Sequence, residues 1–324
     1  MAGHYSKVVV CGAGVMGHSL AVLHARRSEV WLTDISEQAL RRAVPLIRSA
    51  LETMNRAGAL DEAPETVMAR IYCSTKLANC LPGADLVVEA ISENAETKRS
   101  FFAQLVDEND GTAILESHTI VASNTSSLDI FALAPAPLKR RLYGAHHFVP
   151  PHIIPLTEIA QPADPLPGAT DTLLEHYRSV GAVPVLLDRF CPGFIINRIQ
   201  TAIHREMFKL IEEKIVEAQK LDLAVKASLG IRIPVLGILK RLDFAGLDIV
   251  AGNMTRLGLT PPAAISKLVA KGDYGVKTGR GFYDYTDRTT ESIFEERDKA
   301  MLSIRRAMEN ANLLLPRQEK EPSL

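Results

Sequence analysis

The chain has 324 residues, of which 47% are hydrophobic and 23% are charged, and its formal net charge is −1. This length favours two domains over a single core. The near-zero charge disfavours nucleic acid and an anionic membrane surface as partners, and no apolar run is long enough to cross a bilayer. The four cysteines form no CxxC pair, so we expect free thiols in a reducing compartment. With no signal-peptide pattern before the first strand, we expect a cytoplasmic protein.

An apolar run followed by a glycine-rich turn opens the chain. Residues 8–11 are wholly apolar, as expected of a parallel strand buried on both faces. Gly12, Gly14 and Gly17 follow as GxGxxG, and residues 15–25 are predicted to form a helix. The first glycine permits a tight turn, the second lets the backbone approach a pyrophosphate, and the third allows close packing of helix on strand. The motif predicts a dinucleotide-phosphate site; the alternative is a glycine-rich turn with no ligand.

An acidic residue ends the second predicted strand, over residues 29–34. The carboxylate of Asp34 can accept hydrogen bonds from adenosine ribose hydroxyls and would repel the extra phosphate of NADP. A GxGxxG between strand and helix, with an acid at this later position, is a specific signal for NAD. The cofactor contacts predicted on the turn are Gly12, Gly14, Val15, Met16 and Gly17.

Helices and strands continue to alternate along the first half of the chain. Further strands are predicted over residues 84–91, 119–127, 142–148, 154–160 and 183–188. Helices are predicted over residues 37–57, 95–107 and 173–180, and over parts of 63–71. The alternation predicts an α/β fold with a parallel, right-handed, doubly wound sheet. Ligands of such sheets bind at the carboxyl ends of the strands, so the polar residues at those ends are the site candidates.

The second half is predicted to be all helical. Residues 191–194 start a long helix whose apolar positions follow the helical spacing. More helices are predicted over residues 218–229, 238–253, 261–270 and 290–312. We expect residues 1–189 to form the NAD-binding domain and residues 190–324 a helical substrate domain. A helical domain that cannot bury every apolar face alone predicts a homodimer, and the polar tail over 317–324 is expected to fray.

Three histidines lie within seven residues, at His146, His147 and His152. Hydride transfer to NAD needs a base that removes the proton of the alcohol, and histidine is the usual choice. His146 ends a strand at the predicted cofactor rim, and the prolines at 150–151 turn the chain back toward Glu158. A carboxylate there would hold one tautomer and stabilise the imidazolium. We therefore expect a His146–Glu158 dyad; the alternatives are a structural histidine and a solvated edge charge.

The other two histidines are not expected to do chemistry. In a regular strand His147 points to the face opposite His146, where it would pack or lie at the surface, and His152 would lie in a loop. A zinc site is disfavoured, because HHxxxxH is not a usual ligand spacing and no acid or cysteine completes it. Hydride transfer also needs no metal. We predict no metal site.

Several motifs give the chain a resemblance to a known family. They are GAGVMG, VVEAISEN, SNTSS, GAHHFVPP, PLTEI, PGFIINR, GLD and GVKTGRGFYDY. The chain resembles the 3-hydroxyacyl-CoA dehydrogenase family over nearly its whole length. The resemblance implies a Rossmann-type NAD domain and a dimerising helical domain like the C-terminal domain of 6-phosphogluconate dehydrogenase. It also implies oxidation of an L-3-hydroxyacyl-CoA or a related free 3-hydroxy acid to the 3-keto product, with a link to fatty acid metabolism.

The resemblance also implies roles for individual side chains. His146 would be the catalytic base and Glu158 its partner. Ser126 and Asn197 would bind the substrate oxygen, with a turn-stabilising serine and a helix-capping asparagine as alternatives. The remaining cofactor roles fall on Asp34, Glu93, Lys98 and Lys277. A solvated loop charge is the alternative for the last of these lysines.

Departures from the family pattern leave the substrate open. The family usually has Asn where Val149 stands, and Gly-Pro where Gly237 and Ile238 stand. The serine and lysine that acyl-CoA enzymes offer to CoA fall on or near Ala50 and Ala57. The chain also resembles the branch acting on small free hydroxy acids, which includes lambda-crystallin/L-gulonate 3-dehydrogenase, L-carnitine dehydrogenase and a dehydrogenase of pyridoxine breakdown. A non-catalytic, crystallin-like NAD-binding protein is a further alternative; a 6-phosphogluconate-type enzyme is disfavoured because its lysine base has no counterpart.

Overall fold

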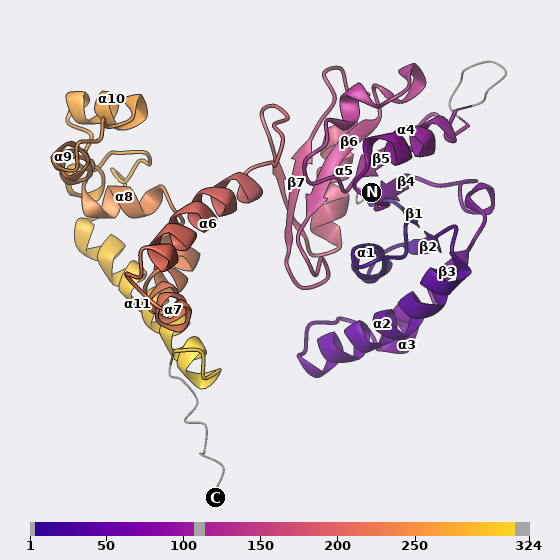
Figure 1. Ribbon diagram of the computed structural model, residues 1–324, viewed down its shortest axis with the longest axis horizontal. Helices are drawn as coiled ribbons and strands as arrows, with labels where there is room; N and C mark the ends of the chain where they lie inside the picture. The colour runs from indigo at the N-terminus through magenta and orange to yellow at the C-terminus, as the bar shows by residue number, and fades with distance from the viewer. Residues whose placement is uncertain (1–3, 107–113, 315–324) are drawn as a thin grey trace, which may run out of the picture. The chain divides into compact units, whose positions relative to one another are not determined.

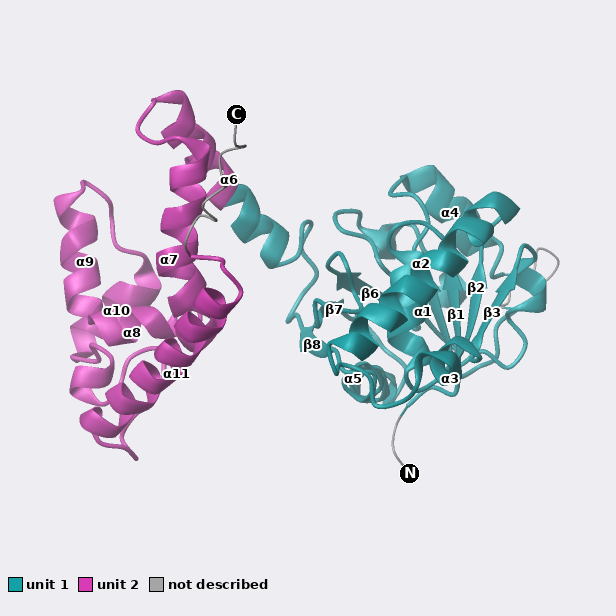
Figure 2. Ribbon diagram, turned by 90° about the horizontal axis from the view of Figure 1, so that it is seen from below, with its two compact units in different colours: residues 1–202 teal, residues 203–324 magenta. Residues whose placement is uncertain are grey.

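The computed structural model describes residues 4–106 and 114–314 of the chain. It divides into two compact units, Met1–Ala202 and Ile203–Leu324, which Figure 2 shows in different colours. Within the described residues, no helix is long and apolar enough to cross a membrane. The predicted end of one helix, Asp107, and the polar tail over residues 317–324 lie outside the described residues.

The first unit is built on one eight-stranded sheet, in the order β3-β2-β1-β4-β5-β6-β7-β8 (Figure 1). The strands are β1 Lys7–Cys11, β2 Glu29–Thr33, β3 Ile71–Ser74, β4 Leu86–Glu89, β5 Ile120–Ser123, β6 Leu142–His147, β7 Leu156–Ala160 and β8 Val183–Leu186. Neighbouring strands are parallel from β3 to β6. The prediction of a parallel sheet is therefore correct up to β6, whereas β7 runs antiparallel to β6 because the chain reverses at the prolines.

Helices cover both faces of this sheet. They are α1 Gly17–Ala25, α2 Glu37–Arg56, α3 Pro64–Met68, α4 Ala95–Ala103 and α5 Ala169–Ser179, with short 3₁₀ turns at Leu77–Asn79, Ile130–Ala132 and Ala136–Leu138. Successive residues of β1 point to opposite faces, so Val8 and Val10 pack in one core cluster and Val9 and Cys11 in another. The first cluster contains the buried faces of α1, α2 and α5, and the second that of α4. This two-sided burial is the reason residues 8–11 of β1 are wholly apolar.

One strand of the sheet was not predicted. Residues 63–71 were expected to be partly helical, but α3 ends at Met68 and the chain enters the edge strand β3. Two of the four residues of β3 are exposed and two are half-buried, so its sequence carries neither an apolar run nor an alternating pattern. Helix α1 begins at Gly17, two residues later than predicted, because the glycine turn extends through Met16.

The second unit consists of packed helices. Helix α6, Ile196–Glu212, contains the boundary between the units. It is followed by α7 Ala218–Leu236, α8 Lys240–Ala245, α9 Leu247–Arg256, α10 Ala263–Lys271, a 3₁₀ turn at Val276–Thr278 and α11 Thr290–Asn310. The prediction of one helix over 238–253 was wrong: Gly246 has φ +90°, a left-handed conformation that ends α8 before α9 begins. In the described part of this unit, the only strand-like pairings are isolated bridges around Arg280.

Candidate active site

The glycine turn after β1 has the geometry that a bound pyrophosphate requires. Gly12 has φ +103°, and a Cβ there would lie 2.5 Å from the carbonyl oxygen of Ala90. A Cβ on Gly17 would overlap the carbonyl oxygen of Gly12. In contrast, nothing lies within 4 Å of a Cβ placed on Gly14, so the backbone is open to a ligand at that position. Each glycine thus plays the part expected of the motif, which fits the diphosphate of NAD.

A cavity of about 520 Å³ lies beside this turn, and its lining includes Gly12, Gly14, Asp34 and Ile91. The Asp34 carboxylate accepts hydrogen bonds from the backbone N–H of Ala13 at 2.8 Å and of Ser36 at 2.8 Å. These bonds fix the carboxylate at the end of β2, beside the glycine turn. A carboxylate there can accept hydrogen bonds from ribose hydroxyls, so the residues present fit NAD.

His146 and Glu158 form a buried pair at the ends of β6 and β7. They are opposite each other in the antiparallel register, and His146 Nδ1 lies 2.8 Å from Glu158 Oε2. Only 4% of His146 and 1% of Glu158 are exposed. The other carboxylate oxygen accepts hydrogen bonds from the backbone N–H groups of Ile195, at 2.9 Å, and Ile196, at 3.0 Å, where α6 begins. The acid therefore binds the imidazole and the helix N-terminus at once.

This arrangement fixes the tautomer of His146. An ionised carboxylate can only accept hydrogen bonds, so Nδ1 carries the proton and Nε2 keeps a free lone pair. Asn197 Nδ2 lies 3.5 Å from Nε2, at the limit of hydrogen bonding. The rings of Phe194, at 4.9 Å between centroids, and Phe148, at 4.6 Å, pack against the imidazole. The ring is thus held with an unprotonated nitrogen near an amide donor, which is the arrangement of a general base.

A buried ion-pair network lies at the ends of the neighbouring strands β4 and β5. Lys98 is 1% exposed, and its Nζ lies 2.7 and 2.8 Å from the two carboxylate oxygens of Glu89 and 3.3 Å from Glu93 Oε2. Ser123 Oγ also donates to Glu89. Lys98 was predicted to contact the cofactor; the structure gives it two carboxylate partners. Glu89, the acid that ends the otherwise apolar LVVE strand, is expected at the ligand-binding edge of the sheet, but its pairing with Lys98 was not predicted.

Glu93 holds the loop that carries Ser126. Its Oε1 accepts hydrogen bonds from Thr125 Oγ1 at 2.7 Å, Ser126 N at 2.8 Å, Ser127 N at 3.0 Å and Ser126 Oγ at 3.2 Å. Burial raises the pKa of Glu93, but the bond from Thr125, the amides of Ser126 and Ser127 and the charge of Lys98 outweigh it and lower the pKa to about 2. An ionised carboxylate therefore positions the Ser126 hydroxyl and backbone at this edge of the sheet.

Lys277, also predicted to contact the cofactor, lies in the second unit. Its Nζ is 2.7 Å from Asp248 Oδ2 and 5.3 Å from the centre of the Tyr274 ring. The hydrogen bond to Lys277 is the main cause that lowers the pKa of Asp248. The ion pair fixes the lysine side chain against α9.

The other two histidines of the 146–152 stretch lie on the opposite face and in the loop, as predicted, and the cysteines are free. His147 faces the side opposite His146, is 3% exposed, and bonds through its N–H and Nδ1 to Asn124 Oδ1 at 3.0 Å. His152 lies in the loop before β7, where it bonds to Ser19. All four cysteines are free. The described residues contain no group of three or more His, Cys, Asp or Glu side chains that could hold a metal ion.

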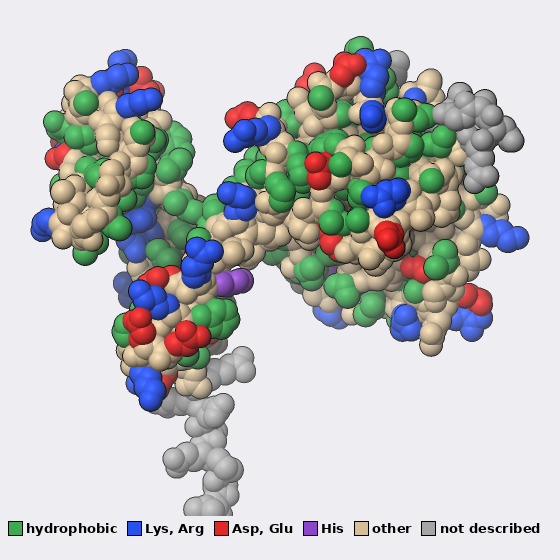
Figure 3. Space-filling model, turned by 45° about the horizontal axis from the view of Figure 1, so that its top comes forward, with side chains coloured by type: hydrophobic (Ala, Val, Ile, Leu, Met, Phe, Trp, Pro, Cys, Tyr) green, Lys and Arg blue, Asp and Glu red, His purple; other side chains and the backbone are tan. Residues whose placement is uncertain are grey.

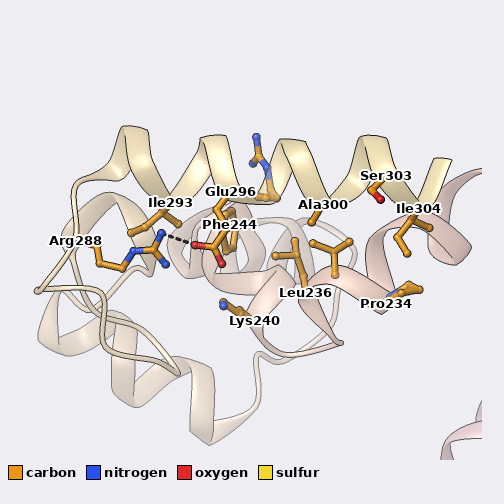
Figure 4. Close-up of a pocket in the computed structure, with 12 residues that line it drawn as sticks. Pro234, Leu236, Lys240, Phe244, Arg288, Ile293, Glu296, Ala300, Ser303 and Ile304 are labelled. Carbon is orange, nitrogen blue, oxygen red and sulfur yellow. Dashed lines mark hydrogen bonds and ion pairs between the residues drawn. The ribbon is translucent and has the colours of Figure 1, made fainter. Parts of the chain in front are cut away.

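A second cavity, of about 370 Å³, lies among α7, α8 and α11 in the second unit (Figure 4). Apolar side chains including Leu236, Phe244 and Ile293 line it, and Arg288 at its edge pairs with Glu296 at 2.5 Å. None of the predicted site residues lines this cavity.

Comparison with known families accounts for most of the chain. Residues 7–190 match the model of the 3-hydroxyacyl-CoA dehydrogenase NAD binding domain, and residues 193–285 match that of the C-terminal domain. Helix α11 lies beyond the second match.

Individual relatives cover nearly the full length. The chain is 30% identical, over 93% of its length and 98% of the relative, to 5-formyl-3-hydroxy-2-methylpyridine 4-carboxylate 5-dehydrogenase of Mesorhizobium japonicum. It is 34% identical, over 86% of its length and 100% of the relative, to a probable 3-hydroxybutyryl-CoA dehydrogenase of Deinococcus radiodurans. Among solved structures, the 3-hydroxyacyl-CoA dehydrogenase of Archaeoglobus fulgidus matches with a TM-score of 0.74 and 28% identity, covering 95% of this chain and 99% of that one.

The fold agrees with these matches. A sheet of Rossmann type with the glycine turn and Asp34 precedes a helical domain, as in the matched families. The chain therefore belongs to the 3-hydroxyacyl-CoA dehydrogenase family, and it is an NAD-dependent oxidoreductase that acts on a CH–OH group.

Proposed function

We propose that the chain oxidises a secondary alcohol beta to a carboxyl or thioester group, converting an L-3-hydroxyacyl-CoA or a related free 3-hydroxy acid to the 3-keto product. The observation that carries the proposal is the His146–Glu158 dyad. Its Nδ1 is occupied by a buried carboxylate and its Nε2 is left as a base.

Each of the site residues has a separate role in the proposed reaction. Bound NAD supplies the acceptor of the hydride. His146 Nε2 takes the hydroxyl proton as the hydride leaves, and Glu158 stabilises the imidazolium that forms. The Ser126 hydroxyl and the Asn197 amide hold the substrate oxygen. Asp34 accepts from the adenosine ribose, and Glu93, Lys98 and Lys277 support the cofactor directly or through the loops they hold.

A second candidate is an enzyme restricted to free hydroxy acids. Ala50 packs against the core from α2, and Ala57 has no polar side chain, so neither position offers the hydroxyl or ammonium expected for CoA. Ser49 and Arg56, beside them, are exposed. The relative from Mesorhizobium japonicum, named for a pyridine carboxylate, supports this candidate, and the one from Deinococcus radiodurans, named for a thioester, supports the broader proposal.

The test is NADH formation by the purified full chain with NAD and four alcohols: 3-hydroxybutyryl-CoA, L-gulonate, L-carnitine and 3-hydroxybutyrate. Turnover of the thioester supports a 3-hydroxyacyl-CoA dehydrogenase in fatty acid metabolism. Turnover of a free acid alone supports the second candidate. NAD binding without turnover of any of the four would contradict these four alcohols as substrates and favour either a non-catalytic, crystallin-like protein or a substrate outside this set.

We also propose that residues 190–324 mediate a homodimer and that the enzyme works in the cytoplasm. Hydrophobic side chains lie at the surface of the helical unit (Figure 3), including Phe208, 62% exposed, Ile215, 63%, and Leu257, 76%. Isolated exposed apolar residues are normal, but several large ones in one helical unit favour a partner surface. Light scattering of the purified chain should give twice the monomer mass, and a monomer at micromolar concentration would contradict this.

A further inference from the structure

A cluster of buried aromatic and imidazole rings lies on the sheet face opposite the catalytic histidine. It contains Tyr5 from the start of the chain, His24 from α1, His147 from β6, and His176 and Tyr177 from α5. Each of these residues is 7% exposed or less. Buried polar groups are nearly always hydrogen-bonded, so each ring nitrogen of the three imidazoles should have a hydrogen-bond partner.

The hydrogen bonds fix the proton positions on two of the histidines. The backbone N–H of Tyr5 donates to His176 Nδ1 at 3.1 Å, so this nitrogen is an acceptor. In a neutral imidazole the proton of His176 is then on Nε2, which lies 2.9 Å from His24 Nδ1. His24 Nδ1 must accept that bond. The proton of His24 is therefore on Nε2.

The tautomer of His147 is fixed by its contacts with Asn124. Its backbone N–H donates to Asn124 Oδ1 at 3.0 Å, which identifies that atom as the amide oxygen. The ring Nδ1 lies 3.0 Å from the same oxygen. An oxygen of an amide can only accept, so Nδ1 of His147 carries the proton and Nε2 is a bare acceptor.

The two outer nitrogens are complementary and have no protein partner. Within the described residues, His24 Nε2, a donor, and His147 Nε2, an acceptor, are buried without a hydrogen bond, as are the hydroxyls of Tyr5 and Tyr177. Both imidazoles pack on the Tyr177 ring, with centroids 5.7 Å and 5.3 Å away. Buried polar groups are nearly always hydrogen-bonded, so these groups call for a partner other than the protein.

We propose that His24, His147 and the two tyrosine hydroxyls enclose a binding site for internal water, in which a water molecule accepts from His24 Nε2 and donates to His147 Nε2. Internal waters typically make two to four hydrogen bonds of this kind. The bonds then all run in one direction, from the Tyr5 amide through His176, His24 and the water to His147 and Asn124. A metal ion does not fit, because it would need His24 Nε2 without its proton.

The chain of bonds ends in the loop that follows β5. Asn124 receives both bonds from His147, and its own backbone N–H donates to the carbonyl oxygen of Glu89 at 2.7 Å. The same loop carries Ser126 two residues later. The water-bridged chain is thus a support for the loop, reaching it from the face opposite His146.

The first test is long-range ¹H–¹⁵N NMR of the full chain labelled with ¹⁵N-histidine. The expected result is the Nε2–H tautomer for His24 and His176 and the Nδ1–H tautomer for His147, with cross-relaxation between the His24 ring N–H and water. A His24 or His176 protonated on Nδ1 overturns the chain of bonds. Correct tautomers without a water contact overturn the water site.

The second test is a crystal structure of the full chain at a resolution that shows ordered waters. A water within hydrogen-bonding distance of His24 Nε2 and His147 Nε2 is expected, and empty density or a metal between them overturns the proposal. His118→Gln is the control for the NMR spectra. It removes an exposed histidine (53% of the side chain), so the signals of the three cluster histidines should not change. His147→Phe should remove the water contact of His24; its persistence contradicts the bridge.

Discussion

His146 and Glu158 are cross-strand partners whose side chains meet at 2.8 Å, and the same carboxylate accepts the first amides of α6. One acid therefore orients the imidazole and sets the position of the helix that carries Asn197. The two strands and the helix are fixed to a single buried charge. Because both carboxylate oxygens are occupied, a change at this position alters the base and its amide neighbour together.

Replacing the base tests its role directly. For His146→Gln we expect turnover to fall at least about a hundredfold, because the general base is lost, while NAD affinity changes little. Steady-state kinetics and NAD titration measure the two effects. His118→Gln, at an exposed histidine, is the matched control and should leave both unchanged. Wild-type turnover in His146→Gln would remove this residue from the mechanism.

The partner acid makes a different prediction. In Glu158→Gln the amide oxygen can accept from the start of α6, which leaves its NH₂ group facing His146 Nδ1. Nδ1 would then become the acceptor and Nε2 would carry the proton, the wrong tautomer for a base. We expect turnover to fall by about 10²–10⁴, the scale of a lost tautomer in such dyads. Long-range ¹H–¹⁵N NMR of His146 should show the proton moving to Nε2; an unchanged tautomer with full activity would contradict the dyad.

Much of the first unit was predictable because burial on both faces leaves a plain signal. Residues 8–11 of β1 and 86–88 of β4 are short apolar runs, and the glycine turn follows directly after β1. β3 was not predictable, since an edge strand with exposed residues lacks that signal. The break at Gly246 was also missed, because a glycine inside an apolar pattern does not by itself show a left-handed conformation.

The site was predictable only where neighbours are close in sequence. His146 and Glu158 are joined by one chain reversal, so their pairing could be inferred from the prolines between them. The two amides that bind Glu158 come from 37 and 38 residues later, and nothing in the local sequence indicates them. The same holds for the bond between His24 and His176, 152 residues apart.

Asp34 should determine which dinucleotide binds. In Asp34→Ala the acceptor for the ribose hydroxyls is lost and the repulsion of a 2′-phosphate disappears. We expect weaker NAD binding and a smaller preference over NADP, measured by titration with each cofactor. The carboxylate also accepts the amides of Ala13 and Ser36, so thermal unfolding must confirm that the variant folds. Asp61→Ala, at an exposed acid, is the control; the same cofactor preference in both variants would contradict the ribose contact.

The buried lysine should be important for stability as part of a pair. In Lys98→Met the carboxylate of Glu89, which is 0% exposed, loses its partner in the interior. We expect the free energy of unfolding to fall by about 3–5 kcal/mol, as is usual when one member of a buried ion pair is removed. Adding Glu89→Gln removes the stranded charge, so the double variant should recover part of the loss in urea unfolding. A double variant less stable than Lys98→Met would show that the unpaired charge of Glu89 is not the cause of the lost stability.

The buried histidines should make the protein sensitive to acid. Burial, and then the neighbouring His146, lower the pKa of His147 to about 3, and burial is also the main cause that lowers the pKa of His176 to about 3. In the unfolded chain a histidine titrates near pH ~6.5. Between these values the unfolded state binds more protons, so the stability is complete above pH ~6.5 and is lost as the pH falls toward 3.

The size of the stability loss follows from the difference between the folded and unfolded pKa values of these histidines. At pH 5 each of these two histidines should lower the free energy of unfolding by about 2 kcal/mol relative to neutral pH. Urea unfolding between pH 7.5 and 5 measures the slope, and Glu93, with its pKa lowered to about 2, adds to the loss only at the acid end. His147→Gln should reduce the slope by about one proton. If His147→Gln keeps the wild-type slope, His147 does not stay neutral in the folded protein. The slope arises because the unfolded chain binds a proton at this histidine and the folded protein does not.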